Sequence, residues 1–227
     1  AQIIDQADIP LILVGDSASM MIYGYDTTIP ISMNEIVLLV RAVCRGAKKA
    51  LIVADMPFLS YQPSIEETIK NGGRLIKEGN AHAVKLEGGK HMFNNIKSLV
   101  DTGIPVMGHV GLTPQSYHQM SGYKLQGKTE EDAEKILEDA IAVEKAGAFS
   151  IVLECIPEKL ATKISKKLKI PTIGIGSGNT CDGQIQVFHD VIGLLKGAPP
   201  KHAMQGGNLY NDTLKIIKNY KSKIKNL

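Results

Sequence analysis

The sequence alternates short apolar runs with helix-like segments along most of its length. Apolar runs that predict buried strands occur at 11–16, 51–55, 83–87, 105–109, 150–154 and 171–175, with a weaker one at 190–194. Three of these runs begin at an Ile-Pro dipeptide, and proline suits the first residue of a strand because no backbone donor is needed there. Strands that alternate with helices in this way predict βα units and a parallel sheet.

The predicted helices have recognisable beginnings. A serine or threonine is followed three residues later by an acidic residue, which matches the capping box or its aspartate variant, at Ser32 and Glu35, Ser64 and Glu67, and Thr129 and Asp132. The longest helix is predicted at about 130–146, where Gly147 suits the position after the helix end.

The number of strands constrains the fold class. A closed parallel barrel has eight strands, one more than the seven predicted here. The opening "AQIIDQAD" looks like the tail of an amphipathic helix, so we expect a first strand upstream of residue 1. The prediction is an α/β chain with a single (β/α)8 barrel domain over 1–227 and a C-terminal helix at about 209–225.

The charge of the chain limits the partners that the sequence suggests. A formal net charge of +3 is too small to argue for nucleic acid as a partner. The basic stretch "KIIKNYKSKIK" near the end has two explanations. It is either a solvated amphipathic helix that packs through residues such as Ile216 and Tyr220, or a tail that binds polyanions. The helix is favoured, because lysine is common on exposed helices.

Cysteine usage indicates a compartment. Three widely spaced cysteines with no CxxC pattern favour reduced thiols over a disulfide framework or a zinc site. No signal-like segment opens the chain and no apolar run is long enough for a membrane span. We therefore expect a soluble cytoplasmic protein that has no membrane partner. The alternative is a protein whose targeting segment was removed before residue 1.

Ionisable side chains follow the ends of five predicted strands. They are Asp16, Asp55, Lys85 with Glu87, His109, and Glu154. One acidic residue after a strand is usually a turn former or a helix cap, but the carboxyl ends of barrel strands share one face, which carries the active site. Ionisable residues at the ends of five successive strands therefore indicate an active site.

The residue types indicate the chemistry of that site. Asp16, Asp55 and Glu87 are hard oxygen ligands, which select Mg²⁺ or a similar cation over zinc. Magnesium takes some ligands from its substrate, so a 2-oxo acid could chelate it through ketone and carboxylate. Lys85 would then neutralise an oxyanion or carboxylate, and Ser17 would donate a hydrogen bond to the same acid.

Three further features have alternative explanations. Glu154 lies among apolar neighbours in "VLECIP", which suits a general base; the alternative is a salt bridge to a barrel lysine. His109 could hydrogen-bond substrate, orient Glu87, or be a structural histidine. "GIGSG" at 174–178 is similar to phosphate-cradling loops, or serves only as a tight turn.

Seven ordered blocks between Leu11 and Lys201 resemble one known family. They are "LVGDS", "ADMPF", "VKLEGG", "GHVGLTPQS", "GYKLQGK", "LECIP", and "IGIGSG" followed by "CDGQ", and they look like ketopantoate hydroxymethyltransferase. The resemblance implies a TIM barrel of the phosphoenolpyruvate-binding kind, usually a homodecamer. It implies hydroxymethyl transfer from 5,10-methylenetetrahydrofolate to 3-methyl-2-oxobutanoate, giving 2-dehydropantoate on the way to pantothenate and coenzyme A.

The resemblance also implies roles for single residues. Its magnesium ligands correspond to Asp16, Asp55 and Glu87, of which the two aspartates also contact substrate. Ser17 and Lys85 correspond to substrate-binding residues, and Glu154 to the proton acceptor. The expected mechanism is removal of the C3 proton of the oxo acid by Glu154, with magnesium stabilising the resulting enolate.

Two other functions compete with this one. The first is a related magnesium–enolate enzyme on the same barrel, such as the isocitrate lyase and phosphoenolpyruvate mutase group, which makes or breaks C–C bonds on oxo acids without folate. The second is a degraded barrel kept for assembly or regulation. Dependence on folate separates the first from the transferase, and the complete predicted ligand set argues against the second.

Overall fold

The computed structural model describes residues 1–120, 122–197 and 200–224. The chain divides into two compact units, Ala1–Gln184 and Ile185–Leu227, and each is described by itself. The first contains the sheet, and the second contains α8 (Phe188–Val191) and α9 (Leu209–Ile224). A helix predicted at about 209–225 is therefore confirmed as far as Ile224, since residue 225 lies outside the described residues. The single-domain organisation stays a prediction.

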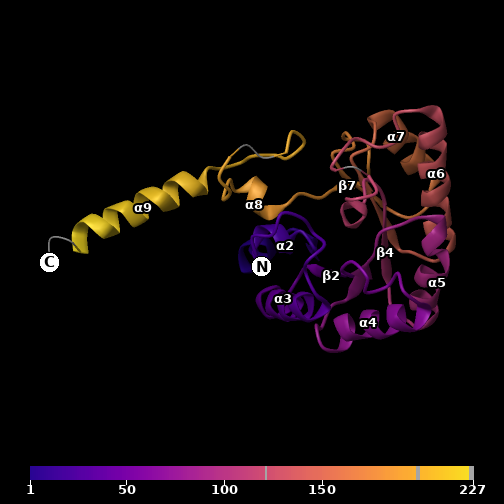
Figure 1. Ribbon diagram of the computed structural model, residues 1–227, viewed down its shortest axis with the longest axis horizontal. Coiled ribbons are helices and arrows are strands. Elements are labelled where there is room, and N and C mark those ends of the chain that lie inside the picture. Colours follow the sequence, from indigo (N-terminus) through magenta and orange to yellow (C-terminus); the bar gives the residue numbers. More distant parts are fainter. Residues whose placement is uncertain (121, 198–199, 225–227) are drawn as a thin grey trace. The chain divides into compact units, whose positions relative to one another are not determined.

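The first unit is built on a curled sheet of parallel strands, each hydrogen-bonded to the next strand in sequence (Figure 1). In the described residues the strands are β1 (Leu11–Val14), β2 (Leu51–Asp55), β3 (Ala83–Lys85), β4 (Val106–Gly111), β5 (Ser150–Glu154), β6 (Thr172–Ile175) and β7 (Gly183–Gln184). The first six confirm the predicted parallel sheet. Every pairing between neighbours is parallel.

The weak strand predicted at 190–194 is wrong. That segment contains the end of α8 and a turn, and the seventh strand is the two-residue β7, which pairs with β6. A short apolar run fits a turn of helix as well as a strand, so periodicity could not separate them. Gly183 and Gln184 carry no apolar pattern, and only backbone pairing with β6 makes them a strand.

Helices cover the outer side of this sheet (Figure 1). In the described part of the first unit they are α1 (Gln2–Gln6), α2 (Ala18–Met21), α3 (Met33–Gly46), α4 (Ile65–Lys77), α5 (Phe93–Asp101), α6 (Glu130–Lys145) and α7 (Glu158–Lys167), with the 3-10 turns η1 (Lys90–Met92) and η2 (Pro114–Ser116). The predicted caps are present: Ser32 and Glu35 form a complete capping box, and the side chains of Ser64 and Thr129 accept the expected backbone hydrogen bonds. None of the described helices is long and apolar enough to cross a membrane.

Pro10, Pro105 and Pro171 lie directly before β1, β4 and β6. Each proline carbonyl accepts a hydrogen bond from the neighbouring strand. Proline has no N–H to donate, so it can serve the ladder only as an acceptor and the strand proper begins one residue later.

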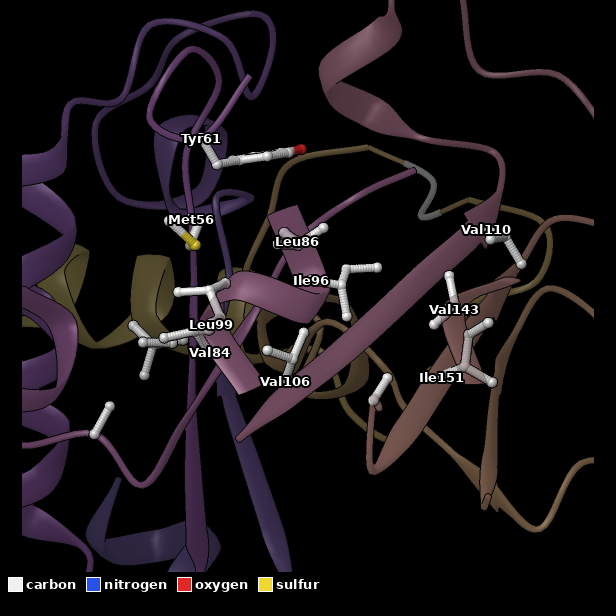
Figure 2. Packing of buried hydrophobic residues seen from close by; sticks show 14 of the residues in the cluster. Met56, Tyr61, Val84, Leu86, Ile96, Leu99, Val106, Val110, Val143 and Ile151 are labelled. Atoms are coloured by element: carbon white, nitrogen blue, oxygen red, sulfur yellow. The ribbon is translucent and has the colours of Figure 1, made fainter. Parts of the chain in front are cut away.

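The larger part of the core lies between the sheet and the helices. Val84 and Val106 of the sheet pack beside Ile96 and Leu99 of α5 (Figure 2). Gly108 lets α6 approach β4 closely, because a Cβ at this position would lie 2.3 Å from the Val143 side chain.

A smaller apolar cluster lies on the opposite face of the strands and positions the candidate site. Its buried members are Val53, Ala83, Met107 and Val152. Side chains two residues apart in a strand point to the same face. Two residues beyond these four, and therefore on the same face, lie Asp55, Lys85, His109 and Glu154.

Candidate active site

The carboxyl ends of the strands bring the predicted ionisable residues into one cluster. Asp16, Asp55, Lys85, Glu87 and His109 are all buried. Glu154, at the end of β5, is more open, with 17 % of its side chain exposed. A cluster of charged groups this deep in a small domain is costly unless the charges compensate one another, so their pairing determines what the site can do.

Lys85 is the central cation of the cluster. Its Nζ lies 2.9 Å from Asp55 Oδ2 and 3.2 Å from Glu87 Oε1. Burial lowers the pKa of Lys85, but the charges of Asp55 and Glu87 outweigh burial and raise that pKa well above its ordinary value. Lys85 is therefore a permanent ammonium that balances two buried carboxylates.

The three buried carboxyl groups of the cluster differ in their pKa shifts. Burial and repulsion from Asp55 raise the pKa of Asp16 well above its ordinary value. Burial also raises the pKa of Asp55, although the Lys85 charge opposes the shift. For Glu87 burial works in the same upward direction, but Lys85 and His109 outweigh it and lower the pKa to about 2. In the metal-free protein, Glu87 is thus the group most firmly held as an anion.

His109 lies between two glutamates. Its Nδ1 is 3.4 Å from Glu87 Oε1, and its Nε2 is 3.2 Å from Glu154 Oε2. Both ring nitrogens are buried, and neither contact has the full geometry of a hydrogen bond. Burial and Lys85 lower the pKa of His109, but the two glutamates raise it to about 9. Within the described residues Glu154 thus forms its ion pair with His109 rather than with a lysine.

Two other predicted features lie at the edge of the cluster. Ser17 follows Asp16 directly, is half-buried, and does not cap α2 with its side chain. In the "GIGSG" segment, which begins in the last two residues of β6, Gly176 and Gly178 have φ values of +64° and +76°. Only glycine adopts such angles readily, so the turn at this motif requires both residues, as a phosphate-cradling loop would too.

Sequence analysis missed two buried members of the cluster. Tyr61 follows β2 in a loop, and Gln115 lies in η2 after β4. The Tyr61 hydroxyl donates to Gln115 Oε1 at 2.8 Å, and Gln115 Nε2 donates to Asp16 Oδ2 at 2.9 Å. Gln115 stands in the block "GHVGLTPQS", but an uncharged polar residue in a loop has no periodic pattern that would mark it.

The donor set fits a hard divalent cation in its chemistry. Asp16, Asp55 and Glu87 offer carboxylate oxygens, and Asp55 Oδ1 is buried without a hydrogen-bond partner, which a cation would satisfy. No three Asp, Glu, His or Cys side chains among the described residues already converge on one point as ligands. Instead, the Lys85 ammonium lies between Asp55 and Glu87. A cation here would take over part of the charge balance that Lys85 supplies.

A cavity of about 590 Å³ opens beside the cluster. Glu87 and Gln115 line it, together with Thr113 and His91. Sites for small molecules usually fall between about 300 and 1,000 Å³. A space of metabolite size therefore adjoins the cluster at Glu87, although the other five ionisable residues of the cluster do not line it.

Known structures show which fold this is. The chain is similar to phosphonopyruvate hydrolase, with a TM-score of 0.62 at 12% identity over 100% of this chain and 78% of that one. It is also similar to phosphoenolpyruvate phosphomutase from Streptomyces platensis subsp. rosaceus, with a TM-score of 0.60 at 12% identity over 97% and 77%. These similarities, together with the curled sheet of parallel strands, confirm the predicted TIM-barrel fold.

Sequence comparisons identify the family. The family model for ketopantoate hydroxymethyltransferase matches residues 1–227. A relative from Geobacter metallireducens is 50% identical over 224 residues, which cover 99% of this chain and 84% of the relative. Another from Thermosipho melanesiensis is 52% identical over 225 residues, covering 99% and 85%. Both relatives are named 3-methyl-2-oxobutanoate hydroxymethyltransferase. With this similarity along its whole length, the chain belongs to the ketopantoate hydroxymethyltransferase family and is an enzyme of the transferase class.

Proposed function

We propose that this enzyme transfers a hydroxymethyl group from 5,10-methylenetetrahydrofolate to 3-methyl-2-oxobutanoate, giving 2-dehydropantoate in pantothenate biosynthesis. The observation that carries the proposal is the buried cluster of Asp16, Asp55, Lys85 and Glu87 in a chain half identical to relatives named for this activity. Overall, the C3–H bond of the oxo acid is replaced by a C3–CH₂OH bond, water supplies the hydroxyl oxygen, and tetrahydrofolate leaves.

Asp16, Asp55 and Glu87 are the residues that would hold Mg²⁺. Their support is the hard-oxygen donor set and the unpartnered Asp55 Oδ1. When bound, magnesium would polarise the oxo acid as a Lewis acid and stabilise the negative charge that develops as C3 loses its proton. Asp16 and Asp55 would also contact the substrate.

Glu154 is the proposed base that takes the C3 proton. It ends β5 on the same face as Lys85 and His109, and it is the most open carboxylate of the cluster, so a substrate can reach it. His109, 3.2 Å from Glu154 Oε2, would hold that carboxylate in place and contact the substrate. Lys85 would pair with negative charge on the oxo acid, and Ser17 would donate a hydrogen bond to its acid group.

The resemblance to the family also supports a homodecamer that works in the cytoplasm, with small-molecule substrates and no nucleic-acid partner. Analytical ultracentrifugation of the purified protein tests the subunit number. A sedimenting species of one or two chains at micromolar concentration would contradict the decamer.

The reaction is tested by NMR of 3-methyl-2-oxobutanoate in D₂O. We expect the C3 proton signal to disappear only with both enzyme and Mg²⁺, and a hydroxymethyl product to form once the folate is added. Exchange without product would indicate a related enolate enzyme instead, and no exchange by the folded, metal-loaded protein would contradict the mechanism.

The role of Glu154 is tested by Glu154→Gln, with Glu131→Gln as the matched control because Glu131 is an exposed residue of α6. Loss of a general base reduces turnover by about 10²–10⁴-fold. We expect that loss in Glu154→Gln, with substrate binding retained, and unchanged exchange in the control. Retained turnover in Glu154→Gln would rule out this base.

A further inference from the structure

Gln115 is a buried amide that uses its whole hydrogen-bonding capacity. Its Nε2 donates to Asp16 Oδ2 and to the Met56 carbonyl, both at 2.9 Å. Its Oε1 accepts from the Tyr61 hydroxyl at 2.8 Å and from Gln62 Nε2 at 3.3 Å. A glutamine side chain has two N–H donors and two acceptor positions, so no part of this amide is left for another ligand.

The orientation of this amide is fixed by its partners. A backbone carbonyl can only accept, so the contact with Met56 requires the amide nitrogen on that side, and the same nitrogen then faces Asp16. Tyr61 reinforces this orientation. Its oxygen accepts from the Glu87 backbone N–H at 3.2 Å. Its hydroxyl has two acceptors within reach, and Gln115 Oε1 at 2.8 Å is closer than the Glu87 carbonyl at 3.2 Å.

Gln115 contacts two of the proposed cation ligands at once. The side chain holds Asp16 Oδ2, and the backbone N–H donates to Glu87 Oε2 at 3.1 Å. Asp16 follows β1 and Glu87 follows β3, so a single residue in η2 links carboxylates that are far apart in the sequence. The ring of Tyr61, which adjoins Gln115, is itself fixed in the apolar core (Figure 2).

We propose that Gln115 is a positioning residue that fixes the carboxylates of Asp16 and Glu87 for a divalent cation, and that Tyr61 sets the orientation of its amide. The inference rests on the proposed function, which assigns those carboxylates as ligands. A buried carboxylate with one oxygen held by a donor loses less freedom when a cation binds. Removing groups that orient metal ligands typically weakens metal affinity by about 10–100-fold.

The test is the dissociation constant for Mn²⁺, used alone as a spectroscopic substitute for Mg²⁺ and measured by electron paramagnetic resonance of the free ion. Gln115→Met keeps the side-chain length but removes every hydrogen bond of the amide. Gln6→Met is the matched control, because Gln6 is an exposed glutamine of α1 that does not line the cavity beside the cluster. We expect about 10–100-fold weaker binding in Gln115→Met and an unchanged constant in the control.

A purely structural role for Gln115 has a different signature. It would lower the unfolding temperature of the metal-free protein and leave the Mn²⁺ constant of the folded protein alone, and that result would overturn the inference. If wild-type protein binds no Mn²⁺, the proposed ligand set fails and this inference fails with it. If the wild type binds Mn²⁺ and folded Gln115→Met binds it with equal affinity, the role of Gln115 is overturned and the proposed ligand set stands.

Tyr61→Phe keeps the test decisive if Gln115→Met does not fold. Phenylalanine preserves the packing of the ring but removes the hydroxyl between Glu87 and Gln115. We expect Mn²⁺ binding to weaken, but by less than in Gln115→Met, since the amide keeps its contact with the Met56 carbonyl. Wild-type Mn²⁺ affinity in Tyr61→Phe would overturn the role given to this network.

Discussion

Replacement of Lys85 by methionine should destabilise the metal-free protein strongly. The ammonium lies 2.9 Å from Asp55 and 3.2 Å from Glu87, and all three side chains are at most 4 % exposed. Removing one partner of a buried ion pair leaves uncompensated charge and typically costs about 3–5 kcal/mol. Methionine is close to lysine in shape, so little of the loss should come from packing. We expect the free energy of unfolding at neutral pH to fall by about 3–5 kcal/mol.

The loss in Lys85→Met should depend on pH. In the wild type, the Lys85 charge lowers the pKa of both Asp55 and Glu87, so its removal raises both in the folded state. A carboxyl group with a raised folded pKa favours the folded state below its unfolded pKa of about 4, and that contribution disappears as pH rises through the folded value. The deficit of the variant should therefore shrink as pH is lowered from neutral.

The assay is urea unfolding followed by circular dichroism, in EDTA, at about pH 7 and pH 5. Lys70→Met is the matched control, because Lys70 forms an exposed ion pair with Glu67 at 3.0 Å. An exposed pair contributes about 0–1 kcal/mol, so the control should stay near wild type. A deficit for Lys85→Met that matches the control and does not change with pH would refute the assignment of Lys85 as the compensating charge.

Three further predictions concern stability and can be measured by the same urea assay. The pKa of His109 is raised from 6.5 to about 9, so the stabilisation it gives is present below about pH 6.5 and lost as pH rises through 9. Metal-free His109→Gln should lack this loss of stability between about pH 6.5 and pH 9. If the free energy of unfolding changed with pH in the same way in the wild type and the variant, the stabilising role given to protonated His109 would be contradicted. Ser32→Ala removes the side-chain acceptor of a capping box with Glu35 and should cost about 1 kcal/mol; no loss would mean that the cap is dispensable. Gly108→Ala should lower the free energy of unfolding by about 1–3 kcal/mol, because the added methyl group crowds Val143. Adding Val143→Ala should restore part of this stability. If the losses of the two single variants simply added in the double variant, the contact between residues 108 and 143 would not be the cause.

Much of the barrel could be predicted because local rules and the final structure agree. Six strands follow from apolar runs, and the α3 and α6 starts follow from Ser32 and Thr129, whose caps depend only on neighbours in sequence. The failure at β7 has the opposite cause. Gly183 and Gln184 have no strand pattern of their own and pair only because β6 offers a free edge.

The sequence by itself determined which side chains meet at the candidate site. Asp55, Lys85, His109 and Glu154 stand at strand ends with the right alternation, and parallel strands in consecutive order bring those ends to one face. Their residue types already indicated a hard cation and an oxo acid.

Only the tertiary structure decided how those groups interact. The position of Lys85 between two carboxylates, of His109 between two glutamates, and of the Gln115 amide against Asp16 depends on distances between strands and loops that lie far apart in the chain. Hydrogen bonds and pKa shifts vary over a few ångströms and with the exclusion of water, and neither quantity is encoded in local pattern. The residue types therefore follow from sequence, whereas their charge states and orientations follow from packing.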